Sequence, residues 1–153
     1  MNTDVNVLMQ WVRVFREHME HLQTRCSRVG IEHDYWNWRE FPRNCCADAA
    51  ELLALYLHEH CGLKPEYLEV TTEGQRDDGM THAWVFCKGL YVDVTADQFP
   101  AVQAAVIVEA NSHWHENFKG YRRLAYGCLI DRLVGPHEAV VDVHAGAGFL
   151  ILL

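Results

Sequence analysis

The sequence predicts an α+β fold in which N-terminal helices, the second carrying a cysteine at its start, pack on an antiparallel β-sheet. Up to residue 62, apolar residues recur at three- and four-residue steps, which is the spacing of an amphipathic helix. Beyond Pro65 the pattern changes to short β-prone runs separated by turn residues. Because helical segments come first and strands follow, the order favours α+β over a repeated strand–helix–strand plan.

Composition indicates one compact domain over residues 1–153. Half of the residues are apolar and 22% are charged, which suits a chain with its own hydrophobic core. The net charge of −8 argues against a nucleic-acid or anionic-membrane surface, because both would repel an acidic protein. The N-terminal region lacks the apolar segment of a secretory signal, and no apolar run reaches the roughly 18 residues of a membrane span. We therefore expect a cytoplasmic protein, and the sequence does not separate action in the producing cell from delivery into another.

Two amphipathic helices are expected before residue 63. The first is expected to end near Gly30, and its apolar positions share one face. These positions are Leu8, Trp11, Val12, Phe15, Met19, Leu22 and Cys26. After an aromatic-rich loop, 31–43, the second helix is expected to begin near Cys45. Asn44 is its predicted N-cap and Gly62 its predicted end.

The strands are expected after Pro65. Tyr67–Thr72 is the first, and HAWVFC and LYVDVT form two more around a two-residue Lys88-Gly89 turn. Ala105–Glu109 is a shorter candidate strand. Residues 112–135 are ambiguous, with a helix over RRLAYGCLIDRL, 122–133, as one option, and the apolar tail AVVDVHAGAGFLILL is expected to be a buried closing strand.

Two adjacent cysteines, Cys45 and Cys46, stand at the start of the second helix. The six cysteines are spread through a core-forming sequence, so we interpret them as reduced thiols rather than a disulfide framework. A cysteine in the first helical turn feels the positive end of the helix dipole, which favours the nucleophilic thiolate. Helical spacing puts Cys46 on the apolar stripe of the helix, so its sulfur should face whatever the helix packs on. Small buried core residues are the structural alternative for both thiols.

The predicted hairpin brings a histidine and an aspartate together. With Lys88-Gly89 as the turn, His82 and Asp93 become diagonal neighbours on one face, roughly 7 Å apart along the backbone. The Asp93 carboxylate can fix the His82 tautomer and leave the other ring nitrogen to take a proton from a thiol. Asp97 is the rival carboxylate, but the strand is expected to end before it. A Cys46–His82–Asp93 triad is therefore geometrically available, although each residue alone has an ordinary structural interpretation.

Three motifs carry a resemblance to a known family. The order of an NCCADAAELLALYL helix, a THAWVF strand and a YVDVTADQF strand resembles transglutaminase-like proteins of the papain-like cysteine-enzyme superfamily. In that family a cysteine opens a helix, commonly as C-x-D/E-x-A/S, followed by H-A-W and then an aspartate near the end of the next strand. Cys46 fits the first motif and Cys45 does not. His82 fits the histidine and Asp93 the aspartate, within a match that covers roughly Phe41 to Phe99, just over a third of the chain.

The resemblance implies a papain/transglutaminase-like fold and an enzyme that needs no cofactor. Thiol attack on an amide carbonyl of a protein or peptide substrate gives a thioester acyl-enzyme. Water resolves it in a peptidase or deamidase, and an amine resolves it in a transglutaminase-type acyltransferase. Some members of the superfamily have lost the triad and act as binding modules, so a non-catalytic protein-interaction module is the alternative. An enzyme should have one cysteine that iodoacetamide labels much faster than the rest, and a binding module none.

The sequence does not identify the oxyanion donor or the residues of the substrate groove. The candidates near the thiol or the histidine are Asn44, Trp36, Trp38 and Trp84, together with the backbone N–H of Cys46. The oligomeric state does not follow from the sequence either.

Ten histidines raise the question of a metal site. The densest groups are His58-Glu59-His60-Cys61 and His113-Trp114-His115. Side chains at i and i+2 diverge on a helix, and no C-x-x-C or H-E-x-x-H spacing occurs. We therefore expect no metal, and we interpret these histidines as solvated side chains near a helix end.

Overall fold

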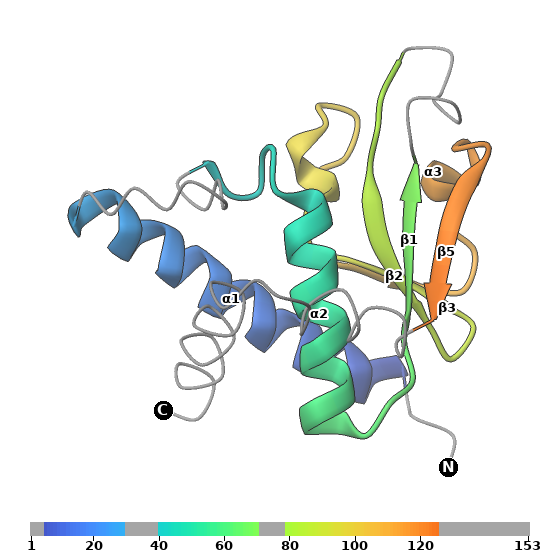
Figure 1. The fold of residues 1–153 in the computed structure, drawn as a ribbon, viewed down its shortest axis with the longest axis horizontal. Coiled ribbons are helices and arrows are strands. Elements are labelled where there is room, and N and C mark those ends of the chain that lie inside the picture. Colours follow the sequence, from blue (N-terminus) through green and yellow to red (C-terminus); the bar gives the residue numbers. More distant parts are fainter. Residues whose placement is uncertain (1–4, 30–39, 71–78, 126–153) are drawn as a thin grey trace, which may run out of the picture.

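A computed structural model of the chain describes residues 5–29, 40–70 and 79–125. The elements are α1 (Val5–Val29), α2 (Cys46–Cys61), β1 (Glu66–Val70), β2 (Ala83–Cys87), β3 (Leu90–Asp93), the 3₁₀ helix η3 (Ala96–Gln98), β4 (Ile107–Glu109), α3 (His113–Glu116) and β5 (Tyr121–Ala125). The strands form an antiparallel sheet in the order β4-β3-β2-β1-β5 (Figure 1). The predicted α+β class is confirmed.

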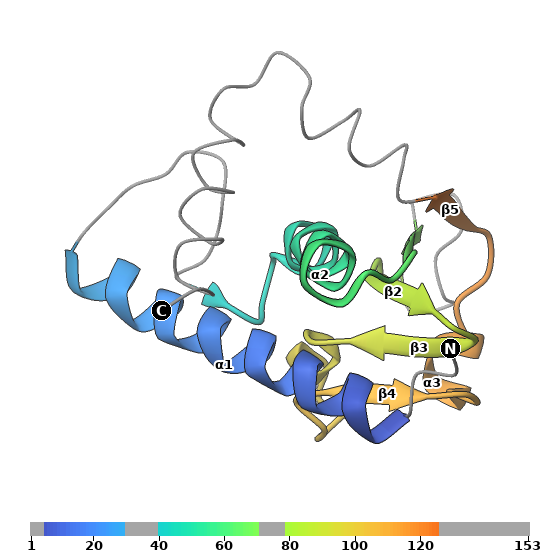
Figure 2. The same ribbon diagram turned by 90° about the horizontal axis from the view of Figure 1, so that it is seen from below.

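Helix α2 packs on one face of the sheet, against β1 and β2, and α1 contacts both α2 and the edge strand β4. Figure 2 shows α2 end-on, with the strands curving around it. The apolar stripe of the sequence accounts for this placement, because Ala49, Leu53 and Leu57 are all buried. The same core takes in the α1 residues Leu8, Val12, Phe15 and Met19. Each large side chain buried in this way stabilises the fold by about 1.5–3 kcal/mol.

Side chains of β2 alternate between the two faces of the sheet. Ala83, Val85 and Cys87 join the core under the helices. Trp84 and Phe86 face the other way, into a second apolar cluster. The other members of that cluster are Leu68, Val70, Phe118, Met80, Tyr91 and Trp114. Because Trp114 lies on α3, this short helix helps to cover the face that α2 leaves open.

The β2–β3 hairpin has the register that a two-residue Lys88-Gly89 turn dictates. Cys87 pairs with Leu90, and the pairing continues regularly along both strands. The two turn residues have positive φ angles, 56° and 80°, as the mirror-image turns of tight hairpins require. The predicted hairpin is therefore confirmed. The same register puts His82 and Asp93 on one face.

Helix α2 ends where the sequence indicates, but its N-terminus differs from the prediction. Gly62 has a φ of 61°, and its N–H donates to a carbonyl one turn earlier at 3.0 Å, which closes the helix. Cys46 is the first helical residue and Cys45 occupies the capping position. Asn44 is therefore not the N-cap. It has a φ of 57°, and its exposed side chain donates to Glu40 instead.

The helix predicted for 122–133 is wrong over its described part. Residues 122–125 belong to β5, an edge strand whose Arg122 and Arg123 pair with Glu69 and Glu66 of β1. Most of its side chains are exposed on both faces, so the sequence shows no strand alternation there. β1 and β4 overlap the strands predicted for them.

Other predictions fall on residues outside the described ones. They concern the aromatic loop 31–39, most of the EGQRDDGM loop and the C-terminal tail. Among the helices that the structure describes, none combines the length and apolar character needed to cross a membrane.

Candidate active site

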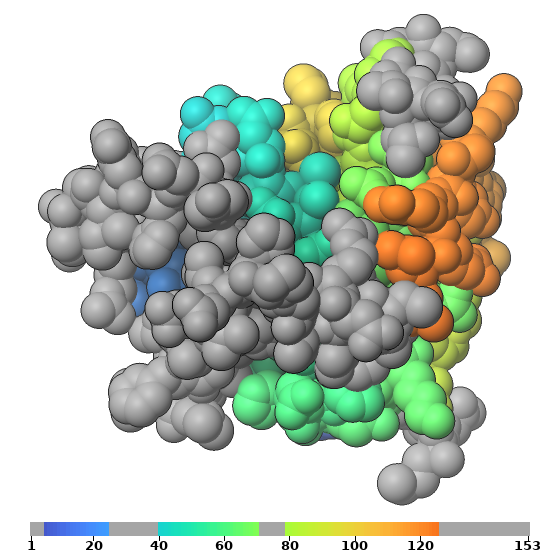
Figure 3. Space-filling model, viewed as in Figure 1, coloured from blue at the N-terminus to red at the C-terminus, as the bar shows by residue number. Residues whose placement is uncertain are grey.

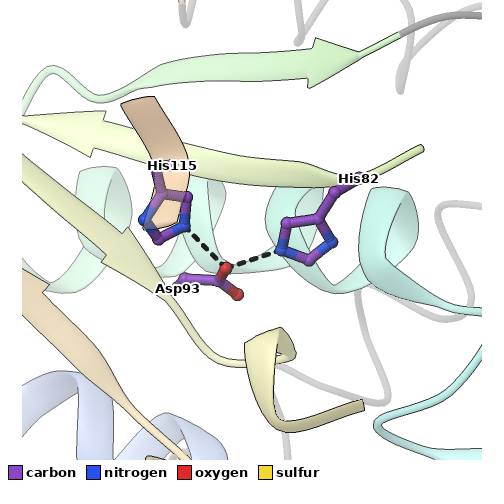
Figure 4. Close-up of side chains that lie close together, drawn as sticks. All are labelled: His82, Asp93 and His115. Atoms are coloured by element: carbon purple, nitrogen blue, oxygen red, sulfur yellow. Dashed lines mark hydrogen bonds and ion pairs between the residues drawn. The ribbon is translucent and has the colours of Figure 1, made fainter. Parts of the chain in front are cut away.

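Asp93, the last residue of β3, is hydrogen-bonded to His82, which immediately precedes β2. The Nε2 atom of His82 lies 2.6 Å from Oδ2 of Asp93 (Figure 4), a distance typical of a charge-assisted hydrogen bond. Each of the two residues is only 1% exposed. Figure 4 also shows the second ring nitrogen of His82 pointing away from the carboxylate. Nδ1 is therefore the nitrogen that faces a reaction partner.

Cys46, the first residue of α2, lies within hydrogen-bonding reach of the His82 imidazole. It is partly exposed, and Figure 3 shows the start of α2, in cyan, reaching the surface beside the η3 region, in yellow. The structure thus brings all three residues of the predicted triad together. A thiol, an imidazole and a carboxylate follow one another in space.

The way in which Cys46 meets His82 differs from the expectation. His82 and Asp93 share a face with Trp84, the face that α3 covers, whereas α2 packs on the opposite face. The sequence predicts only that the Cys46 sulfur faces the surface on which its helix packs. Because His82 stands one residue before β2 begins, the contact forms at the end of the sheet, where α2 also begins (Figure 1).

The electrostatics of the pair favour a protonated imidazole and an ionised carboxylate. Burial lowers the pKa of His82, but the Asp93 charge and the contact with Cys46 outweigh it and raise that pKa to about 9. Burial likewise disfavours the Asp93 carboxylate, yet the neighbouring His82 and His115 hold its pKa well below the usual range. An imidazolium at Nδ1 is the partner that stabilises a thiolate on Cys46.

The Asp93 carboxylate is fixed on both oxygens. Oδ1 accepts hydrogen bonds from the backbone N–H of Thr95 at 2.8 Å and from its hydroxyl at 3.2 Å. Oδ2 accepts from His82 and from a second histidine, His115, at 2.9 Å. Four hydrogen bonds therefore hold a buried charge, which explains how Asp93 can remain ionised in an apolar surrounding.

His115 is a site residue that the sequence did not reveal. It lies on α3 and is 1% exposed, with Nε2 on Asp93 and Nδ1 2.7 Å from the Ser112 hydroxyl. Because the carboxylate only accepts, Nε2 carries the proton, and Nδ1 then accepts from Ser112. The resulting chain, Ser112–His115–Asp93–His82, holds the carboxylate between two imidazoles, which Figure 4 shows on its two sides.

The prediction that the 113–115 histidines are solvated is wrong for His115, although His113 is exposed. Helix α3 has only four residues, too few to show a period from which a buried face could be read. The contact with Asp93 spans 22 positions in the sequence and depends on how α3 sits on the sheet. The one local signal is a serine three residues before a histidine at a helix start, which is weak.

His82, Asp93 and His115 are also residue types that bind metals, and one ligand atom from each lies within 4.8 Å of the others. The distances argue for hydrogen bonds. Two ligands of a tetrahedral zinc at the usual 2.0–2.1 Å would lie about 3.3 Å apart. Here both histidine nitrogens approach a single carboxylate oxygen, at 2.6 and 2.9 Å. We therefore interpret the cluster as a proton-sharing network.

Aromatic rings enclose the histidine. Trp84 stacks on His82 with ring centroids 5.8 Å apart, and Phe99 and Trp114 meet its edges at 5.1 and 5.2 Å. Trp84 is 1% exposed, so its prediction as a groove residue is wrong. It forms the wall behind the imidazole instead. Such an apolar wall strengthens the His82–Asp93 interaction by excluding water.

The rival carboxylate, Asp97, is engaged elsewhere. Both of its oxygens accept from the guanidinium of Arg16 on α1, at 2.8 and 2.9 Å. Arg16 also donates to the Val94 carbonyl at 2.6 Å and lies over the Phe41 ring at 4.6 Å. Arg16 therefore ties α1 to the segment after β3 and to the segment that leads into Cys46.

Three other thiols in the described part of the chain are poor nucleophiles at neutral pH. Burial, followed by the charges of Cys46 and Asp48, raises the pKa of Cys45 to about 12. Burial also raises the pKa of Cys61 to about 12 and that of Cys87 to about 11. Cys45, Cys46, Cys61 and Cys87 are free thiols rather than members of disulfides. Position beside an imidazole thus distinguishes Cys46 from its neighbour Cys45.

The remaining candidates do not complete the site. Trp36 and Trp38 lie outside the described residues, and the Asn44 side chain is exposed and bonded to Glu40. The backbone N–H of Cys46 remains a candidate oxyanion donor, since a first-turn N–H has no intrahelical acceptor. Comparisons with protein-family models, with curated proteins and with solved structures gave no match.

Proposed function

We propose that this protein is a cysteine-dependent amide hydrolase or acyltransferase with a transglutaminase-like, papain-like fold. The observation that carries the proposal is one imidazole held between a carboxylate at 2.6 Å and a helix-N-terminal thiol. The chain order of helix thiol, strand histidine and strand aspartate supports the same class. The proposed substrate is a protein or peptide, and the proposed site of action is the cytoplasm.

In the proposed reaction Cys46 is the nucleophile, His82 carries the proton and Asp93 is the fixed negative charge beside the imidazole. Cys46 Sγ attacks the amide carbonyl carbon, and the C=O π pair moves onto oxygen. His82 Nδ1 carries the thiol proton and then gives it to the leaving nitrogen as the C–N bond breaks and the C=O bond re-forms. Asp93 stays ionised and stabilises the imidazolium. Water or an amine then attacks the thioester, losing its proton to Nδ1, and the product leaves as Sγ takes back its electron pair.

Labelling with iodoacetamide tests whether Cys46 is an activated thiol. We expect one fast-reacting cysteine at pH 6.5, and we expect Cys46→Ala to remove it. Cys45→Ala is the matched control and should leave the fast reaction intact, because burial raises the pKa of Cys45 to about 12. The modified residue is mapped by mass spectrometry.

Two results of that labelling would count against the proposal. If Cys45→Ala removes the fast reaction while Cys46→Ala retains it, the nucleophile is misassigned. If all thiols react slowly, the protein is better described as an interaction module that keeps the fold.

The raised pKa of His82 sets the pH dependence. Nε2 keeps its proton on Asp93, so the proton lost near pH 9 is the one on Nδ1. Without it the leaving amine is not protonated, and we expect acyl transfer from an amide to decline through about pH 9. The folded-state pKa lies above the usual histidine value of 6.5, so this interaction also stabilises the fold fully below pH 6.5, and the stabilisation is lost between there and pH 9. Rate profiles and urea unfolding across that range check both effects, and an alkaline decline centred below pH 7 contradicts them.

A further inference from the structure

Gln98, the last residue of η3, places an amide group beside the imidazole nitrogen that serves the thiol. Its Nε2 donates to the Thr95 carbonyl at 2.9 Å and lies 3.5 Å from Nδ1 of His82. The residue is partly buried, five positions after Asp93 in the chain.

The orientation of this amide follows from its partner. A carbonyl oxygen only accepts, so the Gln98 atom that faces Thr95 is the NH₂ group and not the amide oxygen. One of its two N–H bonds is used there. The distance of 3.5 Å to Nδ1 is long for a hydrogen bond, and a protonated Nδ1 is itself a donor, so His82 does not take up the second N–H. A donor therefore stands next to the atoms where the acyl group would react.

The donor is held in place before any substrate arrives. The backbone N–H of Gln98 donates to Thr95 at 3.1 Å, and the neighbouring Asp97 is bound by both terminal nitrogens of Arg16. Thr95 in turn is hydrogen-bonded to Asp93. The same short segment thus positions the orienting carboxylate and the Gln98 amide, which is the pre-organisation that oxyanion stabilisation requires.

We propose that Gln98 is a catalytic residue that donates its second N–H to the oxygen of the acyl group during attack by Cys46. The inference rests on the proposed function. As Sγ bonds to the carbonyl carbon, the π pair localises on oxygen and the thiol proton resides on His82 Nδ1. Because Nδ1 carries a proton before and during the attack, it does not accept from Gln98, and the second N–H is left for the oxyanion. The backbone N–H of Cys46 is the second donor.

The test compares a reaction that develops an oxyanion with one that does not. p-Nitrophenyl acetate acylates a thiol through a tetrahedral oxyanion, whereas 2,2′-dipyridyl disulfide reacts at sulfur and reports the thiolate alone. We expect Gln98→Met, which keeps the length of the side chain and removes both N–H groups, to slow acylation by about 10²-fold. Its rate with the disulfide should stay within about twofold of the wild type, because thiolate reactivity is set by the His82 contact. Gln98→Ala is the second variant, and Gln103→Ala, at an exposed position, is the control.

The outcomes distinguish a failure of the role of Gln98 from a failure of the proposed function. Equal acylation by wild type and both Gln98 variants overturns the role of Gln98 and leaves the proposed function standing. A parallel loss of both reactions shows that Gln98 only supports the fold or the thiol, which also overturns the role. If wild-type Cys46 is not acylated while it reacts with the disulfide, the proposed function fails first. Thermal unfolding of each variant identifies any that is destabilised, and the inference then rests on the folded one.

Discussion

The Asp93→Asn variant is expected to lose acyl transfer at Cys46 by about 10³-fold at neutral pH, because the amide cannot balance an imidazolium. Asp93 is the main cause of the raised pKa of His82, so its replacement lowers that pKa. The alkaline decline of the rate should therefore move below pH 9. Acylation kinetics and their pH profile measure both effects, and the shifted profile is a result that simple loss of structure does not produce.

The same variant should also be less stable. Asp93 accepts four hydrogen bonds in a buried site, two of them from histidines. An Asn offers one acceptor oxygen and turns an NH₂ group toward other donors, so we expect a loss of about 2–4 kcal/mol. Thr95→Val is the matched control, because it removes the hydroxyl bond to Asp93 and keeps the carboxylate. It should cost about 1 kcal/mol and leave the pH profile unchanged. Equal losses of activity in both variants would indicate that Asp93 acts only through stability.

Arg16→Met is expected to give the second large effect, a loss of about 3 kcal/mol in the free energy of unfolding. The residue is 7% exposed and joins Asp97, the Val94 carbonyl and the Phe41 ring to α1. Its removal leaves Asp97, largely buried, without its cation. Equilibrium unfolding in urea measures the change.

Two further variants show whether the ion pair is the cause. Arg13→Met alters an exposed arginine one turn earlier on α1 and should change stability by less than about 0.5 kcal/mol. Adding Asp97→Leu to Arg16→Met should recover part of the loss, because the only charge then left unpaired by the loss of Arg16 is that of Glu20, which is half exposed. If the double variant is less stable than Arg16→Met alone, the ion pair is not what the substitution disrupts.

The sequence predicts the local parts of the site because short-range chemistry sets them. The Lys88-Gly89 turn fixes the hairpin register, and the register alone places His82 beside Asp93. The apolar stripe of α2 and the stop at Gly62 fix where that helix packs and where it ends. These are relations within one element or between adjacent ones.

The missed residues depend on long-range packing. Arg16 meets Asp97 across 81 positions, and His115 meets Asp93 across 22. Neither contact has a local signature: Arg16 is one of several charged residues on α1, and α3 is too short to show a period. Gln98 has no local signature either. Its position beside His82 is set by η3, a turn whose placement depends on that same Arg16–Asp97 pair.

Acylation of Cys46, followed by intact-mass and peptide mass spectrometry after acid quench, is the most direct measurement of the proposed chemistry. With p-nitrophenyl acetate we expect one acetyl group, labile to hydroxylamine, on Cys46 of the wild-type protein and a rate at least about 10²-fold lower in His82→Ala. Acetylation confined to lysines, or acetylation of Cys46 at the same rate in His82→Ala and wild type, would contradict a thiol activated by the His82–Asp93 pair.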